Sequence, residues 1–256
     1  MLDLCYSQEL TNSATATAEG RKFLFRTGAA FVSARLGISP IAPISPAGFN
    51  SASKGSEVSS AGGLIIAGSY VPKTTAQLAA LRESAGDQLT TIELDVERLL
   101  ASEDARNSEV AKAVKTAEEN LSKSQDVLVM TSRKLITGAT GAESLDIGGV
   151  VAKVLVSFLE QLQIRPRYLI AKVSDPAHCD LYGLADISQG GITSSDMATK
   201  GLKMRRARVV GQAAAGVPLW RCDEERSKFK GLPYVVFPGN VGTADTLYEV
   251  VERWRS

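Results

Sequence analysis

Short continuous apolar runs, separated by helical patterns, constrain the fold of this chain more than any other feature of its sequence. Three runs without alternating polar positions lie at residues 64–67, 127–130 and 234–237. Runs of this kind are typical of strands buried on both faces of a parallel sheet, and further strands are expected at 91–96 and 167–172. Between them, the pattern at 104–123 places its apolar residues along one stripe of a helix. The sequence therefore predicts an α/β fold in three layers, α/β/α, with a mostly parallel sheet.

A glycine-rich turn at residues 190–201 follows the strand predicted at 167–172. Gly190 and Gly191 allow backbone conformations and close approaches that a Cβ atom would prevent. Thr193 and Asp196 have the spacing of a capping box, which marks the first turn of a helix. Such a turn offers free N–H groups and the positive end of the helix dipole, which favour phosphate. The pattern alone also fits a capped helix without a ligand, and it is neither a Walker A loop nor a dinucleotide fingerprint.

Two further turns are expected at the same edge of the sheet. Ser69 follows the run at 64–67, and the glycine turn at 239–242 follows the run at 234–237. Because the carboxyl ends of parallel strands meet at one edge, where ligands collect, the three turns can approach one anion. Ser69 can instead serve as the cap of the next helix.

Five separated motifs together resemble the four-carbon acid sugar kinases, and more narrowly their C-terminal nucleotide-binding domain. The motifs lie at residues 20–27, 68–78, 190–201, 205–220 and 233–242. Family members carry a preceding substrate domain that begins with an Ala-Asp-Asp-Leu-Thr-Gly-like motif, which this sequence does not contain.

The resemblance implies an ATP-dependent kinase, with Mg²⁺, that phosphorylates the terminal hydroxyl of threonate, erythronate or 3-oxo-tetronate. The nucleotide-binding residues that it implies are Ser69, Gly190, Gly191, Ile192, Thr193, Ser194, Gly239, Asn240 and Gly242. The general base would belong to a substrate domain in cis or in trans, so no catalytic residue and no metal ligand of this chain is assigned. The alternative is a non-catalytic nucleotide-binding fragment from a truncated or mis-spliced gene model, and a homodimer is left open.

The same resemblance divides the chain into three parts. Residues 1–37 are expected to be a remnant of the substrate domain and hinge, 38–62 a flexible linker rich in Pro, Gly and Ser, and 63–256 the nucleotide-binding domain. In the family, the strand that ends at Lys172 passes directly into the glycine motif, whereas here residues 173–189 intervene. We interpret them as an insertion, either a translated intron or a genuine loop, which sequencing of the transcript would distinguish.

The composition excludes several classes of protein. With 44% hydrophobic and 22% charged residues and a formal net charge of +1, the chain gives no reason to expect a nucleic acid or an anionic membrane as partner. No apolar run is long enough to span a bilayer, and three scattered cysteines form no CxxC pair, which favours a reduced, cytoplasmic setting. His178 lies beside Cys179, but the sequence holds no second histidine, so no metal or nucleophile site is assigned there.

Overall fold

The computed structural model describes residues 29–39, 41–51, 59–68, 72–133, 136, 138–173 and 194–255. The chain divides into two compact units, Met1–Ala42 and Pro43–Ser256. The boundary between them falls inside the segment that the sequence predicts to be a linker. The first unit contains helix α2 (Ala29–Arg35).

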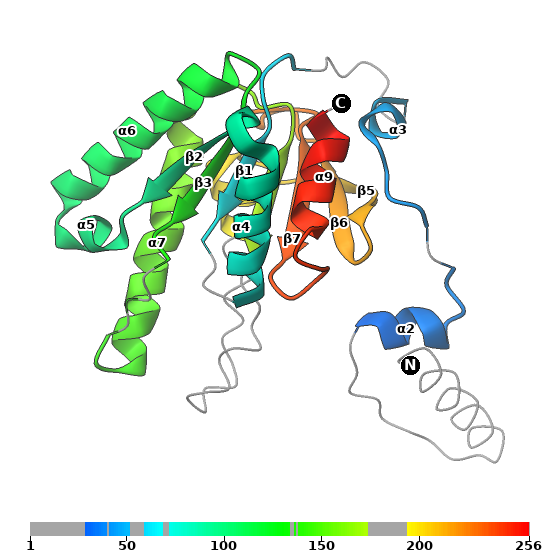
Figure 1. The fold of residues 1–256 in the computed structure, drawn as a ribbon, viewed down its shortest axis with the longest axis horizontal. Helices are drawn as coiled ribbons and strands as arrows, with labels where there is room; N and C mark the ends of the chain where they lie inside the picture. The colour runs from blue at the N-terminus through cyan, green and yellow to red at the C-terminus, as the bar shows by residue number, and fades with distance from the viewer. Residues whose placement is uncertain are drawn as a thin grey trace. The chain divides into compact units, whose positions relative to one another are not determined.

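One mixed sheet of seven strands organises the second unit, in the order β2-β3-β1-β4-β7-β6-β5 (Figure 1). Its strands are β1 (Leu64–Ala67), β2 (Leu89–Leu94), β3 (Asp126–Thr131), β4 (Leu169–Val173), β5 (Ala207–Ala214), β6 (Val217–Cys222) and β7 (Pro233–Pro238). Strands β1 to β4 and β7 run parallel, whereas β5 and β6 are added antiparallel at one side. The predicted mostly parallel sheet is therefore confirmed.

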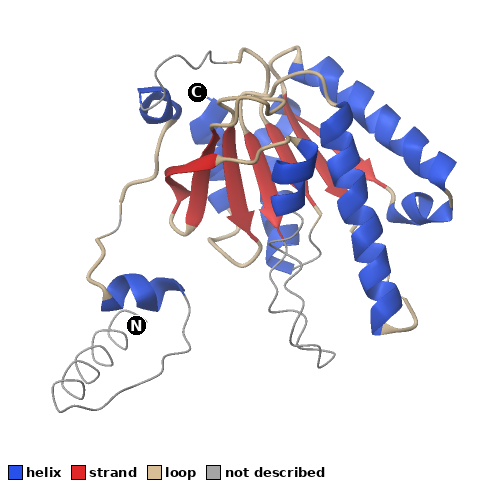
Figure 2. Cartoon of the chain, turned by 180° about the vertical axis from the view of Figure 1, so that it is seen from behind, coloured by secondary structure: helices blue, strands red, loops and turns tan. Residues whose placement is uncertain are grey.

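Helices cover both faces of this sheet because the buried strands are apolar on both sides. In β1, Leu64 and Ile66 pack against α5 (Val96–Ala101), α6 (Glu103–Leu121), α7 (Gly141–Gln161) and the π-helical turn η3 (Met197–Gly201). Ile65 and Ala67 pack on the opposite side, against α4 (Pro72–Ala85) and α9 (Thr246–Arg255). We call these sides the α7 face and the α4 face. Figure 1 views the sheet from α4 and α9, and Figure 2 from behind.

The stripe predicted for the helix at 104–123 is buried as expected. Val110, Ala113, Ala117 and Leu121 of α6 are at most 3% exposed and belong to the core of the α7 face. The helix begins after Ser102, whose Oγ accepts a hydrogen bond from the N–H of Ala105 at 3.1 Å, an N-cap that satisfies one free donor of the first turn.

A short helix that the sequence analysis did not predict lies in the segment expected to be a linker. Helix α3 (Pro46–Ser51) buries Phe49, which is 1% exposed and meets the ring of Trp254 edge-on, with centroids 5.7 Å apart. The N–H of Ile44 also donates to the carbonyl of Gln212 on β5, at 2.8 Å. This part of the segment thus belongs to the packed core of the second unit.

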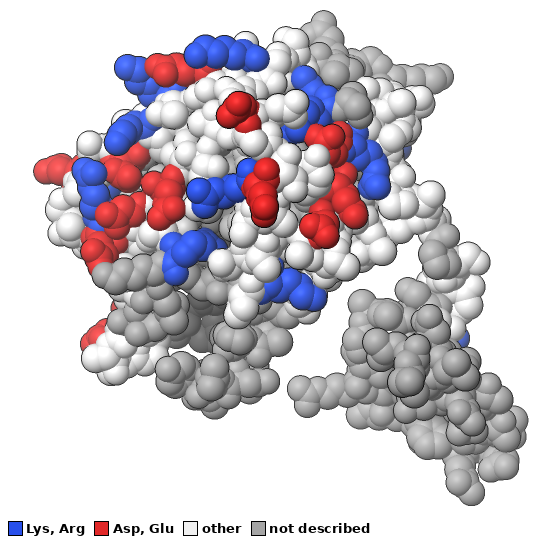
Figure 3. All heavy atoms as spheres, viewed as in Figure 1, with Lys and Arg blue, Asp and Glu red and all other residues white. Residues whose placement is uncertain are grey.

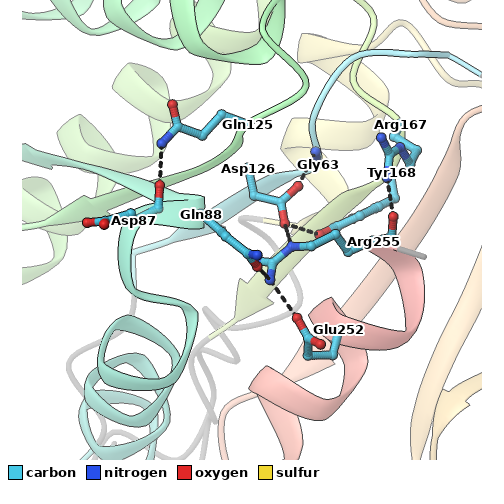
Figure 4. A network of polar contacts seen from close by, with 9 residues as sticks. All are labelled: Gly63, Asp87, Gln88, Gln125, Asp126, Arg167, Tyr168, Glu252 and Arg255. Atoms are coloured by element: carbon cyan, nitrogen blue, oxygen red, sulfur yellow. Dashed lines mark hydrogen bonds and ion pairs between the residues drawn. The ribbon is translucent and has the colours of Figure 1, made fainter.

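The amino ends of the central strands are joined by one buried carboxylate (Figure 4). Asp126, at the start of β3, is 1% exposed and accepts three hydrogen bonds. Its donors are the N–H of Gly63 at 2.6 Å, the hydroxyl of Tyr168 at 3.1 Å and Nε of Arg255 at 2.9 Å. These contacts tie β1, β3 and the chain before β4 to α9, and they lie at the end of the sheet opposite to the expected ligand site.

The surface of the α4 face carries acidic and basic side chains that alternate over its helices (Figure 3). This mixture agrees with the nearly balanced net charge, and the described residues of this face form no broad basic stripe of the kind that tracks nucleic acid. None of the helices in the described ranges is long and apolar enough to pass through a membrane.

Candidate functional site

The carboxyl edge of the sheet, where β1, β3, β4 and β7 end, is the candidate site. The chain leaves β1 toward β2 on one side of the sheet and leaves β4 toward β5 on the other. The strand order therefore reverses between β1 and β4, and in open α/β sheets ligands bind beside such a point, outside the carboxyl ends of the strands. Gly68 follows β1 at this edge, and Lys172 is the penultimate residue of β4.

Five of the nine predicted nucleotide-binding residues lie outside the described residues. They are Ser69, Gly190, Gly191, Ile192 and Thr193. Asp196, the expected partner of Thr193 in a capping box, forms an ion pair with Lys200 at 2.8 Å. The role of the first glycine turn stays a prediction.

Ser194 is described, and it lies on the α7 face. It is 5% exposed, and its carbonyl accepts a hydrogen bond from the hydroxyl of Tyr234 at 2.8 Å. Burial raises the pKa of Tyr234 well above its ordinary value, so this hydroxyl keeps its proton and remains a donor. The contact anchors the chain at the start of the turn that leads into η3.

Gly239, Asn240 and Gly242 lie just after β7, in a segment that starts at the last residue of this strand and that we call the β7 loop (residues 238–243). Helix α4 holds this loop on the α4 face. Nζ of Lys73 donates to the carbonyl of Asn240 at 3.0 Å, and Nε2 of the buried Gln77 donates to the carbonyls of Val241 and Thr243 at 2.9 and 2.7 Å. The structure thus brings these three residues to the first turns of α4, whereas Ser194 lies on the opposite face.

The conformation of the β7 loop requires glycine at position 242. Gly242 has φ +81°, in the left-handed region that other residues rarely adopt, and a Cβ atom there would lie 2.7 Å from Thr246. The side chain of Thr246 in turn accepts a hydrogen bond from the N–H of Thr243 at 2.9 Å, where α9 begins. The glycine turn and the start of α9 are therefore one packed unit.

Lys172 is a buried lysine at the centre of the carboxyl edge. It is 2% exposed and pairs with Ala67 of β1 on one side and Phe237 of β7 on the other. Its Nζ donates to the carbonyl of Pro238 at 2.9 Å and lies 3.9 Å from the centroid of the Phe237 ring. Burial lowers the pKa of Lys172 to about 7, and the positive charge of Lys73 adds to this shift.

The first turn of α4 faces the same loop with a second lysine and a buried hydroxyl. Lys73 is exposed apart from its bond to Asn240. Thr74 is fully buried, and within the described part of the chain its Oγ1 has no hydrogen-bond partner. A buried hydroxyl without a partner is unusual in a folded protein, and here it lies at the positive end of a helix that is 14 residues long.

The residues predicted from the sequence did not include Lys73, Thr74 or Lys172. One signal was available for Lys172, because it ends the apolar run of β4, and lysine is rarely buried in a central strand. A strongly shifted pKa in such a position marks a candidate functional group. For Lys73 and Thr74 no local signal separates them from an ordinary first helical turn.

The chemistry of this edge suits an anion. The ammonium groups of Lys73 and Lys172 and the N-terminus of α4 all lie at the β7 loop. In the described ranges, no carboxylate lies within ion-pair distance of Lys172. Among the described residues there is likewise no group of three or more His, Cys, Asp or Glu side chains that could hold a metal ion. The residues therefore fit phosphate groups, and we assign no protein ligand to Mg²⁺.

A family model agrees with this geometry. The model described as a nucleotide-binding C-terminal domain matches residues 64–171 and 182–247, which include all seven strands apart from the last two residues of β4. The chain belongs to this family. The resemblance to the C-terminal domain of the four-carbon acid sugar kinases is therefore confirmed, and the second unit is a nucleotide-binding domain. The residues between the two matched stretches overlap the segment 173–189, whose interpretation as an insertion stays a prediction.

Two solved structures share the fold of this nucleotide-binding domain. One is a domain of unknown function (DUF1537) from Bordetella bronchiseptica, described as a domain-swapped dimer with bound citrate, with 18% identity and a TM-score of 0.53 over 76% of this chain. The other is described as a putative tRNA synthase from Salmonella typhimurium LT2, with 15% identity and a TM-score of 0.53 over 75% of this chain. The chain spans 41% and 40% of their lengths. No curated protein is similar enough to this sequence to match it.

Proposed function

We propose that this nucleotide-binding domain takes ATP at its carboxyl edge and, with a substrate domain, transfers the γ-phosphoryl group to the terminal hydroxyl of a four-carbon acid sugar. The observation that carries the proposal is the pair of ammonium groups of Lys73 and Lys172 beside the β7 loop, in a domain whose family binds nucleotides. Threonate, erythronate and 3-oxo-tetronate are the substrates that we propose.

Phosphoryl transfer depends mainly on positioning the phosphates and on stabilising their charge. In this proposal the backbone of Gly239, Asn240 and Gly242 lines one side of the phosphates, and Ser69 with residues 190–194 lines the other. The chain's own contribution is to bind and orient the nucleotide. The four-carbon acid and the general base belong to the substrate domain, so no residue of this chain is given a role in removing the proton of the sugar hydroxyl.

Mg²⁺ belongs to the proposal as a companion of the nucleotide. When bound, it would neutralise part of the charge of the phosphates. Since the described residues offer no carboxylate cluster, we expect the ion to enter with the phosphates.

A specific observation supports the alternative that this chain alone is a non-catalytic nucleotide-binding fragment. The chain spans only about two fifths of each solved relative, so the substrate domain would have to act in cis or in trans. A homodimer is compatible with the domain-swapped dimer described for the Bordetella protein, and light scattering of the purified chain tests it.

The experiment uses the full 256-residue chain. Calorimetric titration with MgATP is followed by assays of phosphate transfer to threonate, erythronate and 3-oxo-tetronate, with and without the substrate domain of a family member added in trans. We expect the chain alone to bind ATP but to show no phosphate transfer above background. Turnover should appear once the substrate domain is added. The Gly242→Ala variant, which we expect to bind ATP more weakly, should lower that turnover.

Each other outcome changes the proposal. Turnover by the chain alone would place the catalytic groups within it. ATP binding without turnover in either mixture would favour the non-catalytic fragment. No ATP binding would overturn the proposed site.

A further inference from the structure

Lys73 and Lys172 come from different layers of the fold and meet the same short loop. Lys172 ends the apolar part of β4, and Lys73 lies in the first turn of α4. Their ammonium groups donate to the carbonyls of Pro238 and Asn240, two residues apart in the β7 loop. Each ammonium has three N–H donors, so each keeps two for a further acceptor.

The amino groups of Lys73 and Lys172 lie near one another, and no carboxylate among the described residues balances their positive charge. The strand neighbours of Lys172, Ala67 and Phe237, are uncharged, and Lys73 of α4 is the charged group that adds to its pKa shift. Burying an ammonium in such surroundings is unfavourable unless an anion joins it. The arrangement is therefore incomplete by itself and becomes balanced when an anion with several negative oxygens binds.

The start of α4 adds a second, independent observation. Thr74, in the same turn as Lys73, is fully buried, and within the described ranges its Oγ1 has no partner. A hydroxyl can donate to a phosphate oxygen, and the N-terminus of a helix of this length favours negative charge.

We propose that Lys172 and Lys73 clamp the polyphosphate of the nucleotide between β4 and α4, in exchange for part of their bonds to the carbonyls of Pro238 and Asn240. This inference deepens the proposed function, since it rests on the nucleotide lying at the carboxyl edge. It makes the site selective for nucleotides with at least two phosphates, because these carry more negative charge and more acceptor oxygens than a monophosphate for the two lysines to engage. It also links the ligand to the β7 loop, whose carbonyls hold the lysines in the empty site.

The test compares Lys172→Met and Lys73→Met with Lys115→Met, which removes an exposed lysine of α6 and serves as the matched control. Full-length proteins are titrated calorimetrically with ATP, ADP, AMP and inorganic tripolyphosphate. We expect each clamp variant to bind ATP and tripolyphosphate at least about tenfold more weakly, a loss of the size that one charge-assisted contact produces. AMP affinity should change less than threefold, and the control should match the wild type. Lys73 is exposed, so Lys73→Met tests the clamp without changing the packing around Lys172.

A second readout separates a phosphate contact from a merely structural role. Titrations at pH 7.5 in two buffers of different ionisation enthalpy measure proton uptake, because a bound polyphosphate raises the pKa of Lys172 from about 7. Wild type and Lys115→Met should take up a fraction of a proton, and Lys172→Met should lose this uptake.

The outcomes distinguish this inference from the proposed function. Unchanged ATP and tripolyphosphate affinity in both clamp variants overturns the clamp and leaves the proposed function standing. Lysine-dependent binding of tripolyphosphate without binding of ATP supports the clamp and overturns the ATP site. If the wild type binds neither ligand, both are overturned.

Discussion

The ammonium nitrogen of Lys172 lies 3.9 Å from the centre of the Phe237 ring on the neighbouring strand, at the middle of the sheet's carboxyl edge. A cation over an aromatic face is favourable, but this one is also 2% exposed and shares its surroundings with Lys73. Burying this amine therefore lowers the stability of the folded chain, a cost that is common at functional sites.

Lys172→Met should stabilise the empty protein, most strongly at low pH. The folded pKa of about 7 lies below the ordinary 10.5, so the unfolded chain holds a proton between these values that the folded chain has lost. Stability due to Lys172 consequently rises with pH from 7 to 10.5, and below pH 7 the cost of the buried charge is complete. We expect a gain on the order of 2 kcal/mol below pH 7, after the lost hydrogen bond and ring contact are discounted.

Urea unfolding of wild type and Lys172→Met at pH 6, 8 and 10 measures this gain, and the difference between the two proteins cancels the titration of other groups. The gain should shrink toward zero near pH 10.5. A variant that is less stable than wild type at pH 6 would contradict the burial cost.

Arg255→Met should destabilise the second unit by roughly 2–3 kcal/mol. It leaves the buried carboxylate of Asp126 with Gly63 and Tyr168 as its donors, and the Arg255 side chain is itself only 19% exposed. The matched control is Arg98→Met, because the Arg98 side chain is 56% exposed in its pair with Glu109 and should change stability by less than about 0.5 kcal/mol. Equal effects of the two variants in urea unfolding would show that the Asp126 contact contributes no more than a surface pair.

Gly242→Ala and Gly149→Ala should change stability in opposite directions. The first forces a Cβ into a positive φ and against Thr246, and we expect a loss of about 1–3 kcal/mol with several-fold weaker ATP binding. Gly149 lies within α7 with open space around it, so alanine there should add about 0.5–1 kcal/mol. Thermal unfolding and calorimetric titration measure both effects. A neutral Gly242→Ala would mean that the β7 loop can rearrange without affecting the site.

Deletion of residues 173–189 should tighten the binding of an ATP analogue by at least about tenfold, because small displacements at such a site are costly. The deletion joins Lys172 directly to Gly190, and the closure of a loop depends only weakly on its length. We therefore expect a small change in melting temperature. Calorimetric titration of both forms decides between the alternatives: equal affinity would identify a neutral loop, and weaker binding would identify a functional one.

The fold could be predicted from the sequence because its signals are local and consistent. Continuous apolar runs gave the positions of β1, β3 and β7, and the stripe of α6 matched its buried residues. Helix α3 was missed because Phe49 is buried by Trp254, which lies far away in the chain. No local pattern in a segment rich in Pro, Gly and Ser predicts such a long-range contact.

The site could be predicted only in part, for a related reason. Glycine turns after apolar runs pointed to the β7 loop, where the structure places Gly239, Asn240 and Gly242 against α4. The burial of Lys172 depends on the neighbouring strands and on the loop after β7, so it follows from the packing of distant segments and not from its own surroundings in the sequence. The nucleotide-binding roles of all nine residues stay predictions, and five of the nine, Ser69 and residues 190–193, lie outside the described residues.

The position of β1 in the strand order has a consequence for folding kinetics. Leu64 pairs with Val127 and Leu169, whereas β2, the strand that follows β1 in the chain, is separated from it by β3. Long stretches of chain must close before this strand gains either partner, which slows folding. The hairpin β5–β6 needs no such closure and can form in about 1–10 μs. The apolar strand β1 is thus among the last to pair with its neighbours during folding. We therefore expect aggregation during refolding to begin at β1, in the centre of the sheet.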